Sequence, residues 1–128
     1  MEYRALGGSG LHVSRIGLGT MAWGRDVEWP VVPELVHDFV EGGGNLIDTA
    51  PAYGGGVAEQ MIGKLLATGI PRDSLAIATK AGFVIRGERR IIDTSYLNLG
   101  NYHPRALAAH GKAGNQLRQR LLARVLRQ

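Results

Sequence analysis

Two short apolar runs, each followed by an ionisable residue, constrain the fold of this chain more than any other feature. Leu46–Ile47 runs into Asp48, and residues 75–78 (Leu-Ala-Ile-Ala) are followed by Thr79 and Lys80. Short apolar runs between helical patterns are typical of buried parallel strands. A charge at the tip of such a strand is costly unless it is paired. We therefore expect Asp48 and Lys80 to meet at the carboxyl edge of a parallel sheet, where barrels carry their catalytic groups.

The remaining pattern predicts a hairpin followed by alternating strands and helices. Residues 3–6 and 11–16 flank a glycine-rich turn, which is typical of a β-hairpin. The later elements are expected, in order, as a strand at 16–20, a helix at 34–41, a strand at 45–48, a helix at 57–67 and a strand at 75–79. This alternation indicates an α/β fold with right-handed crossovers. We expect an irregular loop over 81–103 and a helix over 116–127.

Composition excludes several classes of protein. The chain has 128 residues, one domain's worth, and its mean hydropathy of −0.05 fits neither a disordered nor a membrane protein. It has no cysteine, and its four histidines show no metal-ligand spacing, so we expect no disulfide and no metal site. The N-terminus has no signal pattern and no run approaches the ~20 apolar residues of a membrane span. We expect a cytoplasmic protein without membrane insertion.

The net charge of +4 is divided unevenly along the chain. Residues 1–100 hold 9 of the Lys and Arg residues and all 11 acids, whereas residues 101–128 hold 6 basic residues and no acid. The basic character therefore belongs to the C-terminal segment, and we do not expect a nucleic-acid binder. We divide the chain into residues 1–104 and a basic, helical tail at 105–128.

Tyr53 joins Asp48 and Lys80 as a candidate for chemistry. It lies five residues past Asp48, in the loop above the same strand, so an acid, a phenol and an ammonium would converge on one edge. Each residue also has a structural explanation: Asp48 could cap a loop, Tyr53 could pack, and Lys80 could mark a strand end. Their order and their shared place at strand tips favour chemistry.

Residues 17–22 (Gly-Leu-Gly-Thr-Met-Ala) offer an alternative, because they match the G-x-G-x-x-A pattern of dinucleotide-binding folds. That pattern requires a helix to begin at once, so that its N-terminus can hold the pyrophosphate. Residues 23–30 (Trp-Gly-Arg-Asp-Val-Glu-Trp-Pro) do not look like a first helical turn. We therefore favour an ordinary strand exit here.

Several stretches, in the same order, resemble the N-terminal part of an aldo-keto reductase, a (β/α)8 barrel enzyme that uses NADPH. They are residues 3–7 (Tyr-Arg-Ala-Leu-Gly), 9–14 (Ser-Gly-Leu-His-Val-Ser), 16–21 (Ile-Gly-Leu-Gly-Thr-Met), 45–50 (Asn-Leu-Ile-Asp-Thr-Ala), Tyr53 with Gly54, Glu59 with 62–63 (Ile-Gly), and 78–82 (Ala-Thr-Lys-Ala-Gly). The resemblance runs from residue 2 to about 104 and is closest to the bacterial branch related to potassium-channel β subunits. It implies an incomplete (β/α)8 TIM barrel: the first three β/α units, with the N-terminal β-hairpin closing the bottom.

The resemblance also implies a reaction. A hydride would pass from NADPH to the carbonyl carbon of an aldehyde or ketone, and Tyr53 would protonate the carbonyl oxygen. Lys80 beside Tyr53 would favour the phenolate, and Asp48 would hold Lys80 in place. The implied contacts are Thr20, Met21 and Asp48 for the nicotinamide-ribose and Trp23 for the substrate pocket.

The chain departs from the family after the third strand. A fourth active-site member, a histidine in a His-Trp-Pro-like strand ending, has no match, because His103 and His110 lie in other contexts. Phosphate-binding loops follow the seventh and eighth strands of a whole barrel of about 250 residues. We expect a truncated or frame-shifted product that associates with itself through an open sheet edge. The alternative function is a non-catalytic fragment whose basic amphipathic tail binds anionic surfaces.

Overall fold

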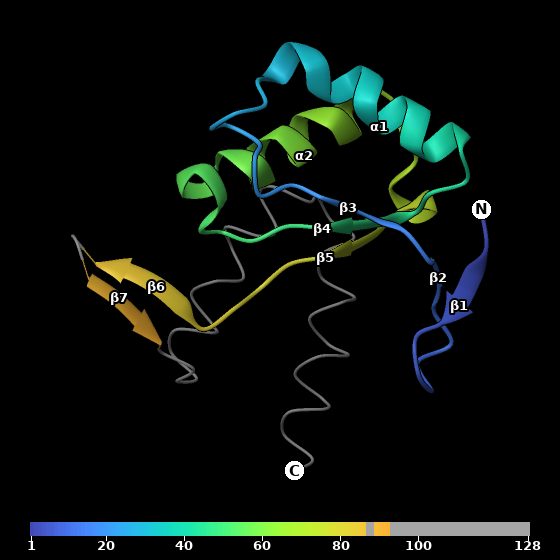
Figure 1. The fold of residues 1–128 in the computed structure, drawn as a ribbon, viewed down its shortest axis with the longest axis horizontal. Coiled ribbons are helices and arrows are strands. Elements are labelled where there is room, and N and C mark those ends of the chain that lie inside the picture. The colour runs from blue at the N-terminus through green and yellow to red at the C-terminus, as the bar shows by residue number, and fades with distance from the viewer. Residues whose placement is uncertain (87–88, 93–128) are drawn as a thin grey trace.

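Two helices cover one face of a three-stranded parallel sheet in this protein (Figure 1). The structure, a computed structural model, describes residues 1–86 and 89–92. The sheet has the order β3 (Gly17–Gly19), β4 (Leu46–Asp48) and β5 (Ala76–Ala78), and both pairs are parallel. α1 (Val32–Glu41) connects β3 to β4, and α2 (Val57–Ala67) connects β4 to β5. The expected α/β class with a parallel sheet is confirmed.

Three short 3-10 helices lie at the connections: η1 (Trp29–Val31), η2 (Tyr53–Gly56) and η3 (Arg72–Ser74). α1 begins two residues earlier than predicted, because Pro33 is accommodated in its first turn, where a missing N–H costs no hydrogen bond. The helix ends at Glu41 with Gly42 as its C-cap residue, and Gly43 follows with a φ of +82°, a conformation that suits glycine.

The core lies between the helices and the sheet. Ile47 of β4 is fully buried and packs in one cluster with helix residues that include Val32, Val36, Ile62 and Leu65. Leu35, also in α1, is 37% exposed. Val32 and Val36, one turn apart, present the helix face that meets the core, and Leu35 lies at its margin.

The hairpin of β1 (Tyr3–Ala5) and β2 (His12–Ser14) lies beyond the amino-terminal end of the parallel strands (Figure 1). Asn45, directly before β4, attaches it there. The side-chain Oδ1 of Asn45 accepts from the backbone N–H of Ser14 at 2.7 Å, and its Nδ2 donates to the carbonyl of His12 at 3.0 Å. Ser14 Oγ in turn accepts from the backbone N–H of Asn45 at 3.1 Å. The hairpin therefore lies at the opposite end of the sheet from Asp48.

The irregular loop predicted over 81–103 is wrong for its first part. β6 (Phe83–Arg86) and β7 (Arg89–Ile92) pair antiparallel, with Arg86 opposite Arg89. β-branched and aromatic residues on both sides of a two-residue connection that begins with glycine favour a hairpin, and this signal outweighs the charged residues between them. The rest of that loop, the predicted helix at 116–127 and the tail at 105–128 lie outside the described residues. Within the described part, no helix is long and apolar enough to cross a membrane.

Candidate functional site

The carboxyl edge of the parallel sheet gathers the polar groups of the candidate site. Asp48 is the last residue of β4, and Lys80 lies two residues past the end of β5. Two backbone hydrogen bonds continue the strand pairing beyond the strands themselves: Thr20 N donates to Asp48 O at 3.0 Å, and Thr49 N donates to Ala78 O at 2.8 Å. The loops that follow the strands are thus held side by side at this edge.

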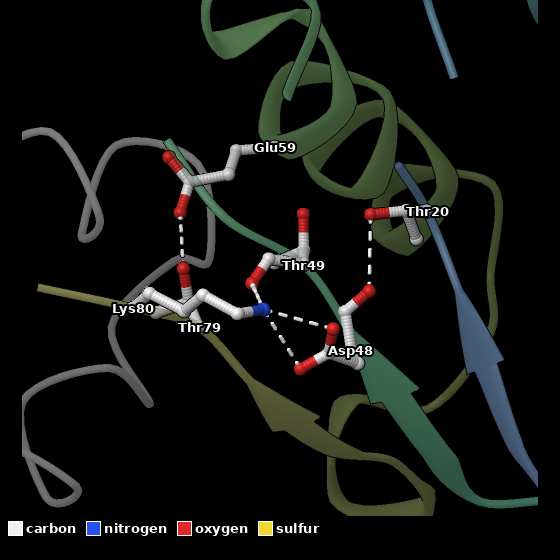
Figure 2. Close-up of polar contacts among 6 residues, drawn as sticks. All are labelled: Thr20, Asp48, Thr49, Glu59, Thr79 and Lys80. Carbon is white, nitrogen blue, oxygen red and sulfur yellow. Dashed lines mark hydrogen bonds and ion pairs between the residues drawn. The ribbon is translucent and has the colours of Figure 1, made fainter. Parts of the chain in front are cut away.

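The ammonium of Lys80 reaches across this edge to the end of β4 (Figure 2). Its Nζ donates to Asp48 Oδ2 at 2.8 Å, to Asp48 Oδ1 at 3.0 Å and to the carbonyl of Thr49 at 3.0 Å. Three acceptors match the three N–H donors of an ammonium. The strand-tip placement inferred from the sequence therefore produces the expected ion pair.

Electrostatics favour the charged form of Lys80. The hydrogen bond to Asp48 raises the pKa of Lys80 above its ordinary value of 10.5, desolvation partly opposes this effect, and Tyr53 adds to it. The side chains of Lys80 and Asp48 are 49% and 50% exposed. A pair this exposed contributes only about 0–1 kcal/mol to stability. The ion pair instead holds a cation at an edge of the sheet that is accessible to solvent.

Tyr53 lies beside this ion pair. The Nζ of Lys80 is 4.9 Å from the centroid of the Tyr53 ring, within the range of a cation–π contact. Tyr53 opens η2, and its backbone N–H donates to Ala50 O at 3.0 Å. Gly54 and Gly55 follow with φ of +56° and +64°, and this tight turn accompanies the placement of the Tyr53 ring beside the Lys80 ammonium. The structure thus brings all three predicted catalytic residues together.

The three other predicted site residues differ in accessibility. Met21 is 60% exposed, so its side chain is available to a ligand. Thr20 is fully buried, and its Oγ1 donates to the carbonyl of Asp48 at 3.1 Å, so its side chain supports β4 (Figure 2). Trp23 is 1% exposed and belongs to the core cluster. A side chain this buried can form the back wall of a pocket, but a substrate could touch it only if its neighbours moved.

Glu59 and Thr79 belong to the site, although sequence reasoning gave them no role. Thr79 Oγ1 donates to Glu59 Oε1 at 2.7 Å, which links α2 to the segment that carries Lys80. A signal for Glu59 was present in the sequence. It lies three residues before Ile62, on the buried face of the predicted helix, and a carboxylate there needs a partner. Among residues 1–86 and 89–92, no group of three His, Asp or Glu side chains could hold a metal ion.

Comparison with known proteins identifies relatives for most of the chain. A model of the Aldo/keto reductase family matches residues 15–117, which extends past the boundary predicted at residue 104. The aldo-keto reductase YhdN of Bacillus subtilis is 41% identical over 85 residues, and the match covers 62% of this chain and 25% of that protein. The L-galactose dehydrogenase of Arabidopsis thaliana is 41% identical over 87 residues, covering 64% of this chain and 27% of that protein.

Solved structures give the same result. The chain superposes on a Pseudomonas aeruginosa protein described as an aldo-keto reductase with a TM-score of 0.74 and 35% identity, over 84% of this chain and 42% of that one. An aldo-keto reductase from Bacillus halodurans, solved in its holo form, gives a TM-score of 0.74 and 31% identity, over 85% and 36% of the two chains. These neighbours are (β/α)8 barrels. The chain spans about a quarter of the length of the curated relatives it matches.

Proposed function

Because this chain belongs to the Aldo/keto reductase family, we propose that its sheet edge is the reducing centre of an NADPH-dependent enzyme that converts aldehydes or ketones to alcohols. The observation that carries the proposal is the meeting of Lys80 with both Asp48 and Tyr53. The Arabidopsis relative, named as a dehydrogenase, supports oxidoreductase chemistry. The natural substrate class would be small carbonyl compounds, and the location cytoplasmic.

Each catalytic residue has a distinct task in this proposal. Tyr53 donates its phenolic proton to the carbonyl oxygen of the substrate as the carbonyl is reduced. A neutral phenol is a weak acid, so the reaction needs a nearby charge that stabilises the phenolate it leaves. The ammonium of Lys80 supplies that charge, 4.9 Å from the ring centroid. Asp48 keeps the ammonium in place and protonated through two hydrogen bonds.

The residues present fit the nicotinamide end of the cofactor. Met21 offers an exposed apolar surface to a planar ring, and the half-exposed carboxylate of Asp48 can accept hydrogen bonds from ribose hydroxyls. Thr20 contributes indirectly, because its backbone N–H and its hydroxyl both hold the carbonyl of Asp48. When bound, the cofactor supplies the hydride. The choice of NADPH over NADH rests on the family resemblance.

A chimera tests the proposal independently of how much of the cofactor site this chain contains. Residues 1–104 would replace the matching N-terminal segment of the Bacillus subtilis relative, and aldehyde-dependent NADPH oxidation would be measured with 4-nitrobenzaldehyde. We expect turnover, and a decrease of about 100-fold or more in the Tyr53→Phe variant, the range that general acid catalysis supplies. A folded chimera whose activity is unchanged by Tyr53→Phe would refute the assignment of Tyr53.

The 128-residue chain by itself is expected to stay at background in the same assay. Its described residues offer a place only for the nicotinamide end of the cofactor. With so few contacts, we expect the chain to bind the cofactor weakly. The alternative function, a non-catalytic fragment that binds anionic surfaces, is supported by the 6 basic residues and absence of acids over 101–128, a segment outside the described residues. Turnover by the chain alone that Tyr53→Phe abolishes would exclude this alternative.

A further inference from the structure

Glu59 carries a buried carboxylate that the proposed reaction does not use. It lies in the first turn of α2 and is 7% exposed, among residues of the helix that face the core. Burial of a carboxylate is costly unless hydrogen bonds compensate for the lost water. One such bond comes from the hydroxyl of Thr79, whose 2.7 Å length is typical of a charged acceptor (Figure 2). This contact joins residues 20 positions apart in the sequence.

The segment that Thr79 belongs to has little other support. Residues 78–80 are all exposed, so core packing does not fix their conformation. Polar contacts hold them instead. Ala78 accepts from Thr49 N at 2.8 Å, and Thr79 donates to Glu59 at 2.7 Å. Lys80 follows directly, and its side chain must turn back toward Asp48 to make its contacts. The direction in which Lys80 leaves the backbone therefore depends on how the preceding residue is held.

We infer that Glu59, acting through the hydroxyl of Thr79, is a positioning residue that holds Lys80 against Asp48. Its importance for catalysis rests on the proposed function, because that function gives Lys80 its task. The positioning itself is a property of the chain without substrate or cofactor. It can therefore be measured without any enzymatic assay.

A simpler role for Glu59 would be to stabilise α2. A carboxylate in the first turn interacts favourably with the positive end of the helix dipole. That role requires only the charge of Glu59, whereas positioning also requires the hydroxyl of Thr79. Thr79→Val removes this hydroxyl with little change in shape at an exposed position, and Thr79→Ser retains it. These two variants separate the roles.

The reactivity of the Lys80 amine reports its position. The full 128-residue chain would be acetylated to a low extent with acetic anhydride, and the labelling of Lys80 relative to Lys64 would be measured by mass spectrometry. An amine that donates hydrogen bonds to a carboxylate reacts slowly, because it is rarely unprotonated and its donors are engaged. Lys64, whose Nζ lies 5.4 Å from the ring centroid of Trp29, is the internal standard.

We expect Thr79→Val to raise the relative labelling of Lys80 by about threefold to tenfold, the range that the loss of one hydrogen bond implies. Glu59→Gln should raise it in the same direction, and Thr79→Ser should match the unmodified chain. Glu34→Gln is the control, because Glu34 is an exposed acid in the first turn of α1. That variant should leave Lys80 unchanged.

Two results would overturn the inference: unchanged labelling of Lys80 in Thr79→Val, or an equal rise of Lys80 and Lys64, which would indicate general loosening. If far-ultraviolet circular dichroism shows that Glu59→Gln does not fold, the comparison of Thr79→Val with Thr79→Ser still tests the inference. A positive labelling result with no Tyr53-dependent turnover in the chimera would remove the proposed function alone. Tyr53-dependent turnover in the chimera together with unchanged labelling of Lys80 in Thr79→Val would refute only the positioning role.

Discussion

At the scale of single residues, Asp48 is fixed by both its main chain and its side chain. Its carbonyl accepts from the backbone N–H of Thr20 at 3.0 Å and from the Thr20 hydroxyl at 3.1 Å. Its carboxylate accepts twice from Lys80. A carboxylate on a rigid strand end can hold an exposed lysine in one direction, which a carboxylate on a mobile loop cannot do at the same entropic cost. Buried Thr20 therefore helps to fix the position of Asp48, and through Asp48 the position of the Lys80 ammonium.

The ion pair predicts a pH dependence of stability. Because the pKa of Lys80 is raised above 10.5 in the folded chain, the stabilisation is fully present below pH 10.5 and is lost as pH rises through the folded value. The free energies of unfolding of the unmodified chain and of Asp48→Asn, measured by urea titration, should differ at pH 8 by up to about 1 kcal/mol. The difference should shrink as the pH rises through the folded pKa of Lys80.

A second ion pair provides the control for this measurement. Arg15 and Glu2 lie 2.7 Å apart with side chains 55% and 71% exposed, and arginine keeps its proton throughout this pH range. The difference between the unmodified chain and Glu2→Gln should therefore stay constant from pH 8 to 11. A constant difference for Asp48→Asn as well would contradict the raised pKa of Lys80.

At the scale of elements, the turn between β4 and α2 decides where Tyr53 lies. Gly54, Gly55 and Gly56 all have positive φ, which allows the chain to reverse within one short 3-10 helix before α2 begins at Val57. The turn also packs against the loop after β3, because a Cβ at Gly54 would lie 2.8 Å from the carbonyl oxygen of Trp23. The loops of two different strands thus meet at Gly54.

Alanine substitutions in this turn should differ in cost. Gly55→Ala should lower the free energy of unfolding by about 1–2 kcal/mol, because its φ is left-handed and its added Cβ meets no atom within 4 Å. Gly54→Ala should cost a further ~1–3 kcal/mol, because its Cβ also collides with Trp23 O. Denaturant titrations of both variants would measure this. Equal costs would show that the two loops are not in contact.

At the scale of the whole molecule, the parallel sheet has unpaired edges in the part of the chain that the structure describes. β3 and β5 each pair with β4 on one side only. Ile16, directly before β3, is 64% exposed. Parallel sheets are normally covered on both faces, and open edges are sites of pairing between chains. We predict self-association through an open edge of the sheet, and the edge at β3, beside Ile16, is the one tested below.

Sedimentation velocity over a range of concentrations would test the association. We expect the unmodified chain to sediment faster as its concentration rises, and Ile16→Lys to weaken this effect, because a lysine beside an edge strand disfavours pairing. Ile92→Lys is the matched control, since Ile92 is 83% exposed on β7, outside the parallel sheet. A monomer at all concentrations with a sharp two-state thermal transition would argue against an open edge.

Local signals predicted most of the fold correctly. The apolar spacing of α2, set between three glycines and Thr68, located the helix at 57–67, and the turn at residues 7–10 located the hairpin of β1 and β2. The β6–β7 hairpin was missed because three arginines and a glutamate in residues 86–90 resemble a solvated loop when considered without their apolar neighbours. Its pairing depends on cross-strand contacts that composition does not reveal.

The sequence by itself determined that an acid and an ammonium stand at the tips of parallel strands, because the parallel direction of the strands follows from the strand–helix alternation. The ion pair of Asp48 and Lys80 was therefore predictable. Only the tertiary structure decided which residues around this ion pair are accessible to a ligand and which are buried and hold the ion pair in place. The burial of Trp23 and Thr20, and the contact of Glu59 with Thr79, depend on how segments far apart in the sequence pack together. Such long-range packing joins residues whose spacing along the chain carries no periodic signal.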